Sequence, residues 1–304
     1  MTATLKIPAF AKINLSLRVL GRREDGYHEL DTIFQTVSLH DTIRISATES
    51  SEIGFSCDDR SLPADSHNLV VRAATALRDR VNTRKGARIR LEKRIPTHAG
   101  LGGGSSDGAA TLVGLARLWE LRTTRQELSE LAARLGADVP FFLNGGTARG
   151  TGIGDCIQAV EDAPETFLLI VKPNTNVSTA DAYQALKKPT LTSSNSKTIL
   201  SSSEAKEFFD SSSFAALQND FEAIVFALEP EIERAKGALL KAGASASLLA
   251  GSGSAVFGIF ESEDAQQRAI QAIELETGWR LFPCKTVGRE QYQAALYSMS
   301  EAGA

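Results

Sequence analysis

The run of residues 96–106 is the part of the sequence whose composition points most directly to chemistry. Four of the five positions from 100 to 104 are glycine, and bare backbone bends tightly and approaches a ligand closely. Apolar residues at helical spacing follow from Ala109, so free N–H groups at a helix N-terminus are expected beside the glycines, and such groups suit a phosphate. We therefore predict a nucleotide-phosphate site, with a plain glycine turn as the alternative, made of Pro96, Thr97, His98, Ala99, Gly100, Leu101, Gly102, Gly103, Gly104, Ser105 and Ser106.

Two widespread phosphate motifs do not fit this run. A Walker A loop ends in Gly-Lys-Ser/Thr, whereas Gly104 is followed by Ser105, and no lysine occurs between Lys93 and Lys172. A dinucleotide fingerprint follows a buried apolar strand, whereas residues 87–94 are charged. The run predicts a phosphate site of another kind.

Two charged residues stand in otherwise apolar surroundings. Lys12 lies in an alternating strand pattern whose polar face is expected to carry Lys12, Asn14, Ser16 and Arg18. An ammonium buried without a partner is costly, so the alternative is an edge-strand lysine facing water. Asp138 follows a predicted helix end in an apolar segment, which suggests a partly buried carboxylate, with a surface turn as the alternative.

The composition is that of an ordinary globular chain and excludes some partners. The 304 residues suffice for two domains, and we place the boundary so that 1–160 and 161–304 are separate. The net charge of −4 argues against nucleic acid as a partner. Three widely spaced cysteines favour a reducing cytoplasm. No apolar run reaches membrane-spanning length, and the oligomeric state is left open.

Strand patterns come first and helices later, which predicts an α+β fold with mixed or antiparallel sheets. Alternation and helical periodicity place the main elements. We expect strands over 5–20, 32–39, 42–47, 87–93, 167–171, 247–250, 256–260 and 285–288, helices over 68–80, 125–135, 214–242 (interrupted near Pro230) and 264–277, and an exposed loop over 190–213 with a short helix near 205–209.

Several blocks stand in a recognisable order along nearly the whole chain. They are Ala-Lys-Ile-Asn-Leu-Ser-Leu at 11–17, Asp-Gly-Tyr-His-Glu-Leu at 25–30, Gly-Leu-Gly-Gly-Gly-Ser-Ser at 100–106, Gly-Ala-Asp-Val-Pro-Phe-Phe at 136–142 and Gly-Ser-Gly-Ser at 251–254. Together they resemble the GHMP kinase superfamily. The first two blocks resemble the branch that acts on a cytidine diphosphate-linked methylerythritol in the non-mevalonate route to isoprenoids.

The resemblance implies a fold and a reaction. The fold is two α+β domains with the active site in the cleft between them. The reaction transfers the γ-phosphoryl group of ATP to the 2-hydroxyl of the small-molecule substrate, with Mg²⁺ arriving with ATP and no dedicated protein metal site. Two alternatives stay open, namely another GHMP kinase of a small alcohol and an inert nucleotide-binding protein on this scaffold.

The resemblance also implies roles for individual residues. Asp138 would be the general base and Lys12 its partner, which stabilises charge on the substrate oxygen. Residues 96–106 would wrap the ATP phosphates, with Ser105 or Ser106 touching a phosphate or the metal. The substrate would be bound by Asn14, by Tyr27 and His28 as a clamp on the cytosine, and by Tyr183 as a second aromatic face.

Overall fold

The computed structural model describes residues 4–186, 216–273 and 276–297. The loop expected over 190–213, with its short helix, lies outside these residues. The described elements are β1 (Thr4–Arg22), β2 (His28–Thr48), β3 (Ile53–Cys57), α1 (Leu69–Arg80), β4 (Gly86–Glu92), α2 (Gly103–Leu118), α3 (Arg125–Leu135), the 3-10 helix η1 (Phe141–Leu143), β5 (Thr147–Gly152), β6 (Cys156–Ala159), β7 (Phe167–Lys172), α4 (Thr179–Ala185), β8 (Gln218–Asn219), α5 (Glu222–Leu228), α6 (Pro230–Lys241), β9 (Ala246–Leu249), β10 (Val256–Phe260), α7 (Glu263–Ile273), β11 (Arg280–Lys285) and α8 (Arg289–Tyr297).

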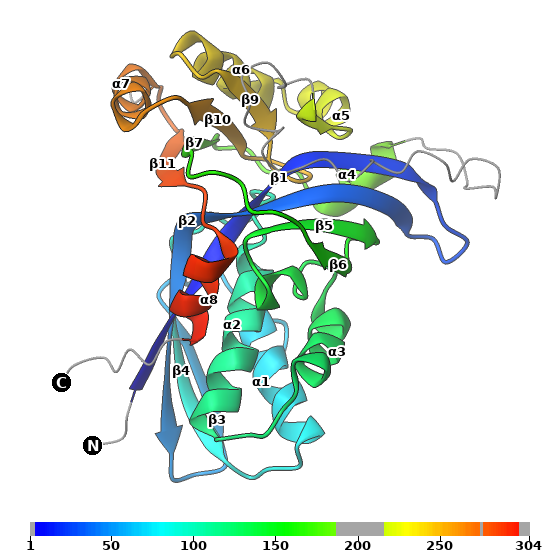
Figure 1. Ribbon diagram of the computed structural model, residues 1–304, viewed down its shortest axis with the longest axis vertical. Coiled ribbons are helices and arrows are strands. Elements are labelled where there is room, and N and C mark those ends of the chain that lie inside the picture. Colours follow the sequence, from blue (N-terminus) through cyan, green and yellow to red (C-terminus); the bar gives the residue numbers. More distant parts are fainter. Residues whose placement is uncertain (1–3, 187–215, 274–275, 298–304) are drawn as a thin grey trace.

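The larger sheet is built on β1 and β2, two long antiparallel strands that run through the middle of the molecule (Figure 1). Its strand order is β3-β4-β2-β1-β8, with β5 paired to β2 and β6 to β5. The pairs β3–β4 and β1–β8 are parallel, and the others are antiparallel. The predicted mixed sheet is confirmed.

Helices α1, α2 and α3 lie together on the larger sheet (Figure 1). The core between them is apolar, with Ile7 and Ile45 from the sheet against Ala74 and Leu112 from the helices. Sequence signals mark where two helices begin. Asn68 accepts from Val70 N at the start of α1, and Thr124 forms a capping box with the third helical residue at the start of α3.

The smaller sheet is antiparallel, with the order β11-β7-β10-β9. Strands β7 and β10 lie in its middle and are almost wholly buried, in keeping with their uninterrupted apolar sequences. Helices α6 and α7 pack against it. The α+β class is confirmed, and the boundary near residue 160 stays a prediction.

Two expectations about the second half were wrong in part. The break in the helical segment 214–242 near Pro230 is confirmed, because α5 ends at Leu228 and α6 begins at Pro230, but the described part before α5 contains β8 and is not helical. The last strand is β11 rather than 285–288, and α8 follows it. Pro283 obscured β11, since proline lacks an N–H, but β11 is an edge strand and tolerates this loss.

The expected polar face of β1 was also wrong in its second half. The register against β2 shifts between Asn14 and Ser16, so the alternation changes phase there. As a result Leu17 lines the large cavity described below together with Lys12 and Asn14, whereas Ser16 is buried without lining it.

Candidate active site

A cavity of about 1340 Å³ opens where β1, β2, the start of α2, α4 and the turn at 251–252 meet. Every residue of the run 96–105 lines it, and so do Lys12, Asn14 and Asp138. The exception in the predicted phosphate run is Ser106, which is buried and carries a hydroxyl without a hydrogen-bond partner. Of the two serines left open by the sequence, Ser105 therefore faces the cavity.

The loop of residues 96–106, called the phosphate loop below for its predicted role, is held by backbone contacts to the turn after β9. Ser254 N donates to His98 O and Ala255 N to Ala99 O, and Ser254 Oγ also donates to His98 O. Gly100 has a left-handed φ of +73°, and a Cβ there would overlap the carbonyl of Ala250. Only glycine fits at this crossing. The blocks at 100–106 and 251–254, far apart in sequence, thus form one surface.

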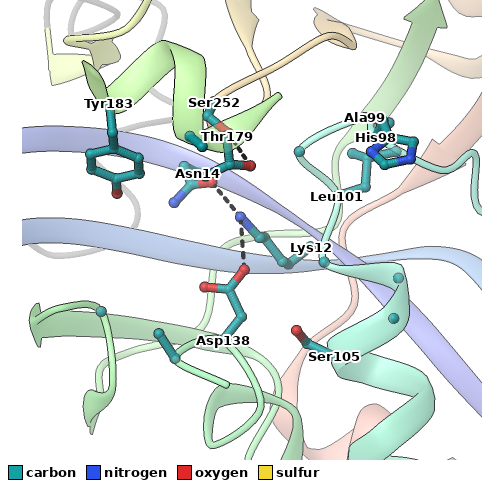
Figure 2. Close-up of a pocket in the computed structure, with 18 of the residues that line it drawn as sticks. Lys12, Asn14, His98, Ala99, Leu101, Ser105, Asp138, Thr179, Tyr183 and Ser252 are labelled. Atoms are coloured by element: carbon teal, nitrogen blue, oxygen red, sulfur yellow. Dashed lines mark hydrogen bonds and ion pairs between the residues drawn. The ribbon is translucent and has the colours of Figure 1, made fainter. Parts of the chain in front are cut away.

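The start of α2 leaves N–H groups available to a ligand. Gly102 is the N-cap with a φ of 67°, and no side chain caps the helix. The first N–H groups of a helix have no partner within it, and the helix dipole adds partial positive charge at that end. Ser105 projects from this first turn toward the same space as Lys12 and Asp138 (Figure 2). The arrangement suits a phosphate group.

Lys12 and Asp138 meet across the cavity. Lys12 Nζ lies 3.5 Å from Asp138 Oδ2, with the lysine side chain 5% exposed and the aspartate side chain 34% exposed. Lys12 reaches this position from the middle of β1, where its N–H also donates to Leu101 O of the phosphate loop. Asp138 comes from the turns between α3 and η1. Gly136 ends α3 as expected, in extended rather than left-handed backbone (φ 169°).

Asn14 holds the lysine amine from the other side. Lys12 Nζ donates to Asn14 Oδ1 (2.9 Å), and Asn14 Nδ2 donates to Thr32 Oγ1 (2.7 Å). Thr32 Oγ1 in turn donates to Ser16 O (2.6 Å). Figure 2 shows the amine between Asn14 and Asp138. This chain of buried hydrogen bonds fixes the amine, while the partly exposed carboxylate stays accessible from the cavity.

Aromatic side chains gather at the other end of the cavity. The rings of His28 and Tyr183 are 5.1 Å apart, and Tyr183 also packs edge-on against Phe221 at 4.8 Å. Tyr27 is 61% exposed at the rim. Burial lowers the pKa of His28, and the charge of Arg22 lowers it further. The ring is therefore neutral near pH 7, with one hydrogen-bond donor and one acceptor. The four predicted substrate residues thus line one cavity with the phosphate loop.

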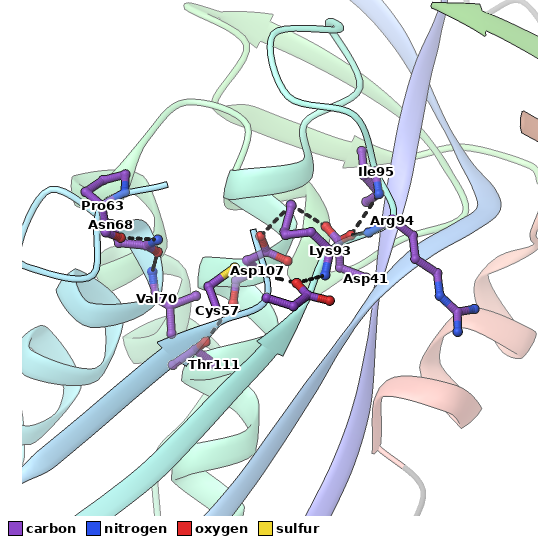
Figure 3. Close-up of polar contacts among 11 residues, drawn as sticks. Asp41, Cys57, Pro63, Asn68, Val70, Lys93, Arg94, Ile95, Asp107 and Thr111 are labelled. Atoms are coloured by element: carbon purple, nitrogen blue, oxygen red, sulfur yellow. Dashed lines mark hydrogen bonds and ion pairs between the residues drawn. The ribbon is translucent and has the colours of Figure 1, made fainter. Parts of the chain in front are cut away.

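Sequence reasoning missed a buried charge cluster beside the phosphate loop (Figure 3). Lys93 Nζ donates to Asp41 Oδ2 and, at 2.9 Å, to Asp107 Oδ2, and all three side chains are at least 93% buried. Asp41 Oδ1 accepts from the backbone N–H groups of Arg94 and Ile95. Burial raises the pKa of Asp107 to about 8. The available signal was Lys93 itself, a lysine at the end of the strand pattern that leads into the glycine-rich run.

The segment before α1 was also missed as a cavity wall. Leu62, Pro63, His67, Asn68 and Leu69 line the cavity beyond the phosphate loop. Asn68 Nδ2 donates to Pro63 O while its carbonyl oxygen caps α1, so one side chain shapes the segment. The sequence marked Asn68 as a helix start and gave no sign that the segment faces a ligand space.

Comparisons with known proteins identify the family to which the chain belongs. Residues 68–146 match the family described as GHMP kinases N terminal domain, and residues 204–277 match GHMP kinases C terminal. A solved homoserine kinase from Cytophaga hutchinsonii shares the fold, with a TM-score of 0.68 at 20% identity over 96% of this chain and 97% of that one. Fold and phosphate loop together define a GHMP kinase.

More similar relatives show to which family within the GHMP kinases the chain belongs. A 4-diphosphocytidyl-2-C-methyl-D-erythritol kinase of Syntrophotalea carbinolica is 43% identical, covering 91% of this chain and 97% of its own. One of Bacillus cereus is 40% identical, covering 89% and 93%. A crystal structure of 4-(cytidine 5'-diphospho)-2C-methyl-D-erythritol kinase superposes with a TM-score of 0.77 at 34% identity over 93% of this chain and 100% of that one. The chain belongs to the 4-diphosphocytidyl-2-C-methyl-D-erythritol kinase family, and it is an ATP-dependent enzyme that acts on a small molecule.

Proposed function

We propose that this kinase transfers the γ-phosphoryl group of ATP to the 2-hydroxyl of 4-diphosphocytidyl-2-C-methyl-D-erythritol, giving ADP and the 2-phosphate. The observation that carries the proposal is the position of the Lys12–Asp138 pair in one cavity, between an uncapped helix start and an aromatic end. Phosphoryl transfer needs two ligands positioned in line, with a group that takes the hydroxyl proton. Each requirement has a candidate residue here.

Asp138 takes the proton of the substrate hydroxyl in this proposal. A third of its side chain is exposed to the cavity, so a hydroxyl can reach its carboxylate oxygens. Lys12 stabilises the negative charge that develops on the attacking oxygen, because a fixed cation in a largely buried setting needs no reorganisation as the charge forms. Asn14 keeps the amine in place through its 2.9 Å hydrogen bond.

The phosphate loop binds the donor. The free N–H groups at the start of α2 and the hydroxyl of Ser105 are the donors that face the cavity. Mg²⁺, when bound, neutralises charge on the transferring phosphoryl group. In this proposal the ion is held mainly by ATP phosphates and water. Ser105 lines the cavity at the helix start, so its hydroxyl is a protein oxygen that would face the ion.

The aromatic end binds the cytidine. The neutral ring of His28 offers a donor and an acceptor to the base edge, and Tyr27 offers an exposed face for stacking. Tyr183 packs against His28 and holds its ring in position.

The described residues contain no helix long and apolar enough to cross a membrane. A cytoplasmic location, the absence of a nucleic-acid partner and the 1–160/161–304 division stay predictions.

The test is ADP release from Mg-ATP with two acceptors, the cytidylated alcohol and the same methylerythritol phosphate without cytidine. We expect turnover with the cytidylated alcohol alone. Turnover with homoserine or mevalonate instead would favour another GHMP kinase of a small alcohol. ADP release that does not depend on any alcohol would contradict the assignment of Asp138 to the acceptor hydroxyl.

A further inference from the structure

Helix α8 packs behind the loop that carries Asp138, on the side away from the cavity. Tyr292 and Phe142, which meet there, are 150 residues apart in the sequence. Three consecutive backbone carbonyls at the end of the loop accept hydrogen bonds from α8: Tyr292 Oη donates to Phe142 O (2.5 Å), Tyr297 Oη to Leu143 O (3.4 Å) and Gln293 Nε2 to Asn144 O (3.3 Å).

Tyr292 is the buried member of this set. It is 1% exposed, and its ring packs against Phe10 at 5.4 Å. Gly145 has a left-handed φ of +63°, and a Cβ there would overlap the Tyr292 ring, so glycine lets the ring lie directly against the loop backbone. Burial raises the pKa of the Tyr292 hydroxyl. The hydroxyl therefore keeps its proton and donates a hydrogen bond to Phe142 O.

Phe142 connects this contact to both halves of the active site. Phe142 N donates to Val139 O, and Val139 N donates to Gly136 O, so the turns that bracket Asp138 are hydrogen-bonded to the residue that Tyr292 holds. The Phe142 ring lies against Gly102, the N-cap of α2, close enough that a Cβ on Gly102 would touch it. A shift of Phe142 would therefore move Asp138 and the phosphate loop relative to each other.

Both ends of α8 are themselves fixed. At its start, Arg289 N donates to Asp162 Oδ2, and the Arg289 guanidinium donates to Thr147 O and Val160 O on β5 and beside β6. At its end, Arg117 of α2 donates to Leu296 O (3.3 Å). The helix is thus a rigid support for the loop and not a loosely attached end of the described chain.

We propose that Tyr292 is a positioning residue for phosphoryl transfer, which sets the Asp138 loop through its hydrogen bond to Phe142 O. It lies outside the cavity and does not touch the substrate. Misplacing a catalytic group by about 1 Å costs on the order of a hundredfold in rate, so a small movement of this loop has a large kinetic effect. This inference rests on the proposed role of Asp138.

The test is Tyr292→Phe, which removes the hydroxyl and keeps the ring. We expect kcat to fall about tenfold, because the buried Phe142 carbonyl is left without its donor and the loop relaxes. KM for both substrates should stay within twofold. Hydrogen exchange should become faster in residues 137–146 and stay unchanged in α1. The matched control is Tyr297→Phe, whose hydrogen bond is longer and whose ring is 40% exposed; its kcat should stay within twofold.

The inference is overturned if Tyr292→Phe keeps kcat within twofold of the original enzyme. It is also overturned if exchange rises equally throughout α1, α2 and α3, because the tyrosine would then act on general stability. These outcomes are separate from failure of the proposed function, which the acceptor selectivity of the unmodified enzyme tests by itself.

Discussion

Two lysine–aspartate clusters line the same cavity, and they differ in how deeply their carboxylates are buried. The Lys93 cluster with Asp41 and Asp107 is almost wholly buried, and Asp41 accepts from an amine and two backbone N–H groups (Figure 3). In the Lys12–Asp138 pair the atoms are 3.5 Å apart and the carboxylate is 34% exposed. The buried Lys93 cluster (the closed cluster) holds structure, whereas a carboxylate with accessible oxygens, as in the Lys12–Asp138 pair (the open pair), can accept a substrate proton.

Replacing the cation of the open pair should have the largest effect. We expect Lys12→Ala to lower kcat by a factor of about 10²–10³, the usual loss when one fixed stabiliser of transition-state charge is removed. The melting temperature should change little, because Asp138 remains partly hydrated. The matched control is Lys6→Ala on the exposed part of the same strand, which should leave kcat unaltered. Equal losses for the two variants would contradict the assignment of Lys12 to catalysis.

Removing a carboxylate from the closed cluster should affect stability instead. Asp41→Ala leaves Lys93 with one carboxylate and leaves two backbone N–H groups, that of Ile95 buried, without an acceptor. We expect the free energy of unfolding to fall by about 3–5 kcal/mol in urea denaturation. Glu165→Ala, which breaks an exposed pair with Lys285, should cost about 0–1 kcal/mol. A similar small loss for Asp41→Ala would show that burial does not distinguish the clusters.

The two serines of the phosphate loop offer the same contrast between an accessible and a buried group, with a smaller expected effect on the kinetics. Ser105 faces the cavity, and Ser106 is 1% exposed. We expect Ser105→Ala to raise KM for ATP about tenfold, as expected for one lost hydrogen bond to a charged group. Ser106→Ala should leave KM unaltered, since its hydroxyl is buried without a partner. Initial rates at varied ATP measure both, and the reverse pattern would contradict the orientation of the helix start.

The closed cluster should also give a pH dependence of stability. Burial raises the pKa of Asp107 from the usual 3.8 to about 8, so the folded state holds a proton that the unfolded state releases over this interval. The stabilisation is present below pH 3.8 and is lost as the pH rises toward 8. Relative to Asp107→Asn, the original protein should therefore lose stability across this range. Parallel stability curves for the two proteins would contradict the shift.

Much of this architecture follows from local patterns in the sequence. The glycines of residues 100–104 run into a helix, and strand patterns precede helix patterns along the chain, so the glycine loop before α2 and the α+β class were predictable. The position of Asp138 relative to Lys12 rested on the family resemblance. No local rule connects residue 12 to residue 138, because the pairing depends on how β1 packs against the loop after α3.

The missed features all depend on contacts distant in sequence. The shift near Ser16 is set by the pairing of β1 with β2 and leaves no mark in the alternation. Asp41 lies 52 residues from Lys93, and a single buried aspartate has the same local pattern as an exposed one. Pro283 is tolerated because β11 lies at a sheet edge, which only the assembled sheet reveals.

The most direct measurement is the rate of ADP formation per folded molecule for Asp138→Asn, with Asp41→Asn as the matched control. Both changes keep the shape of the side chain and remove its charge. The account predicts that Asp138→Asn folds with an unaltered melting temperature and loses turnover by a factor of about 10²–10⁴, the range for a general base. Asp41→Asn should melt earlier and keep its turnover per folded molecule. Near-normal turnover in Asp138→Asn would contradict the assignment of the open pair to catalysis.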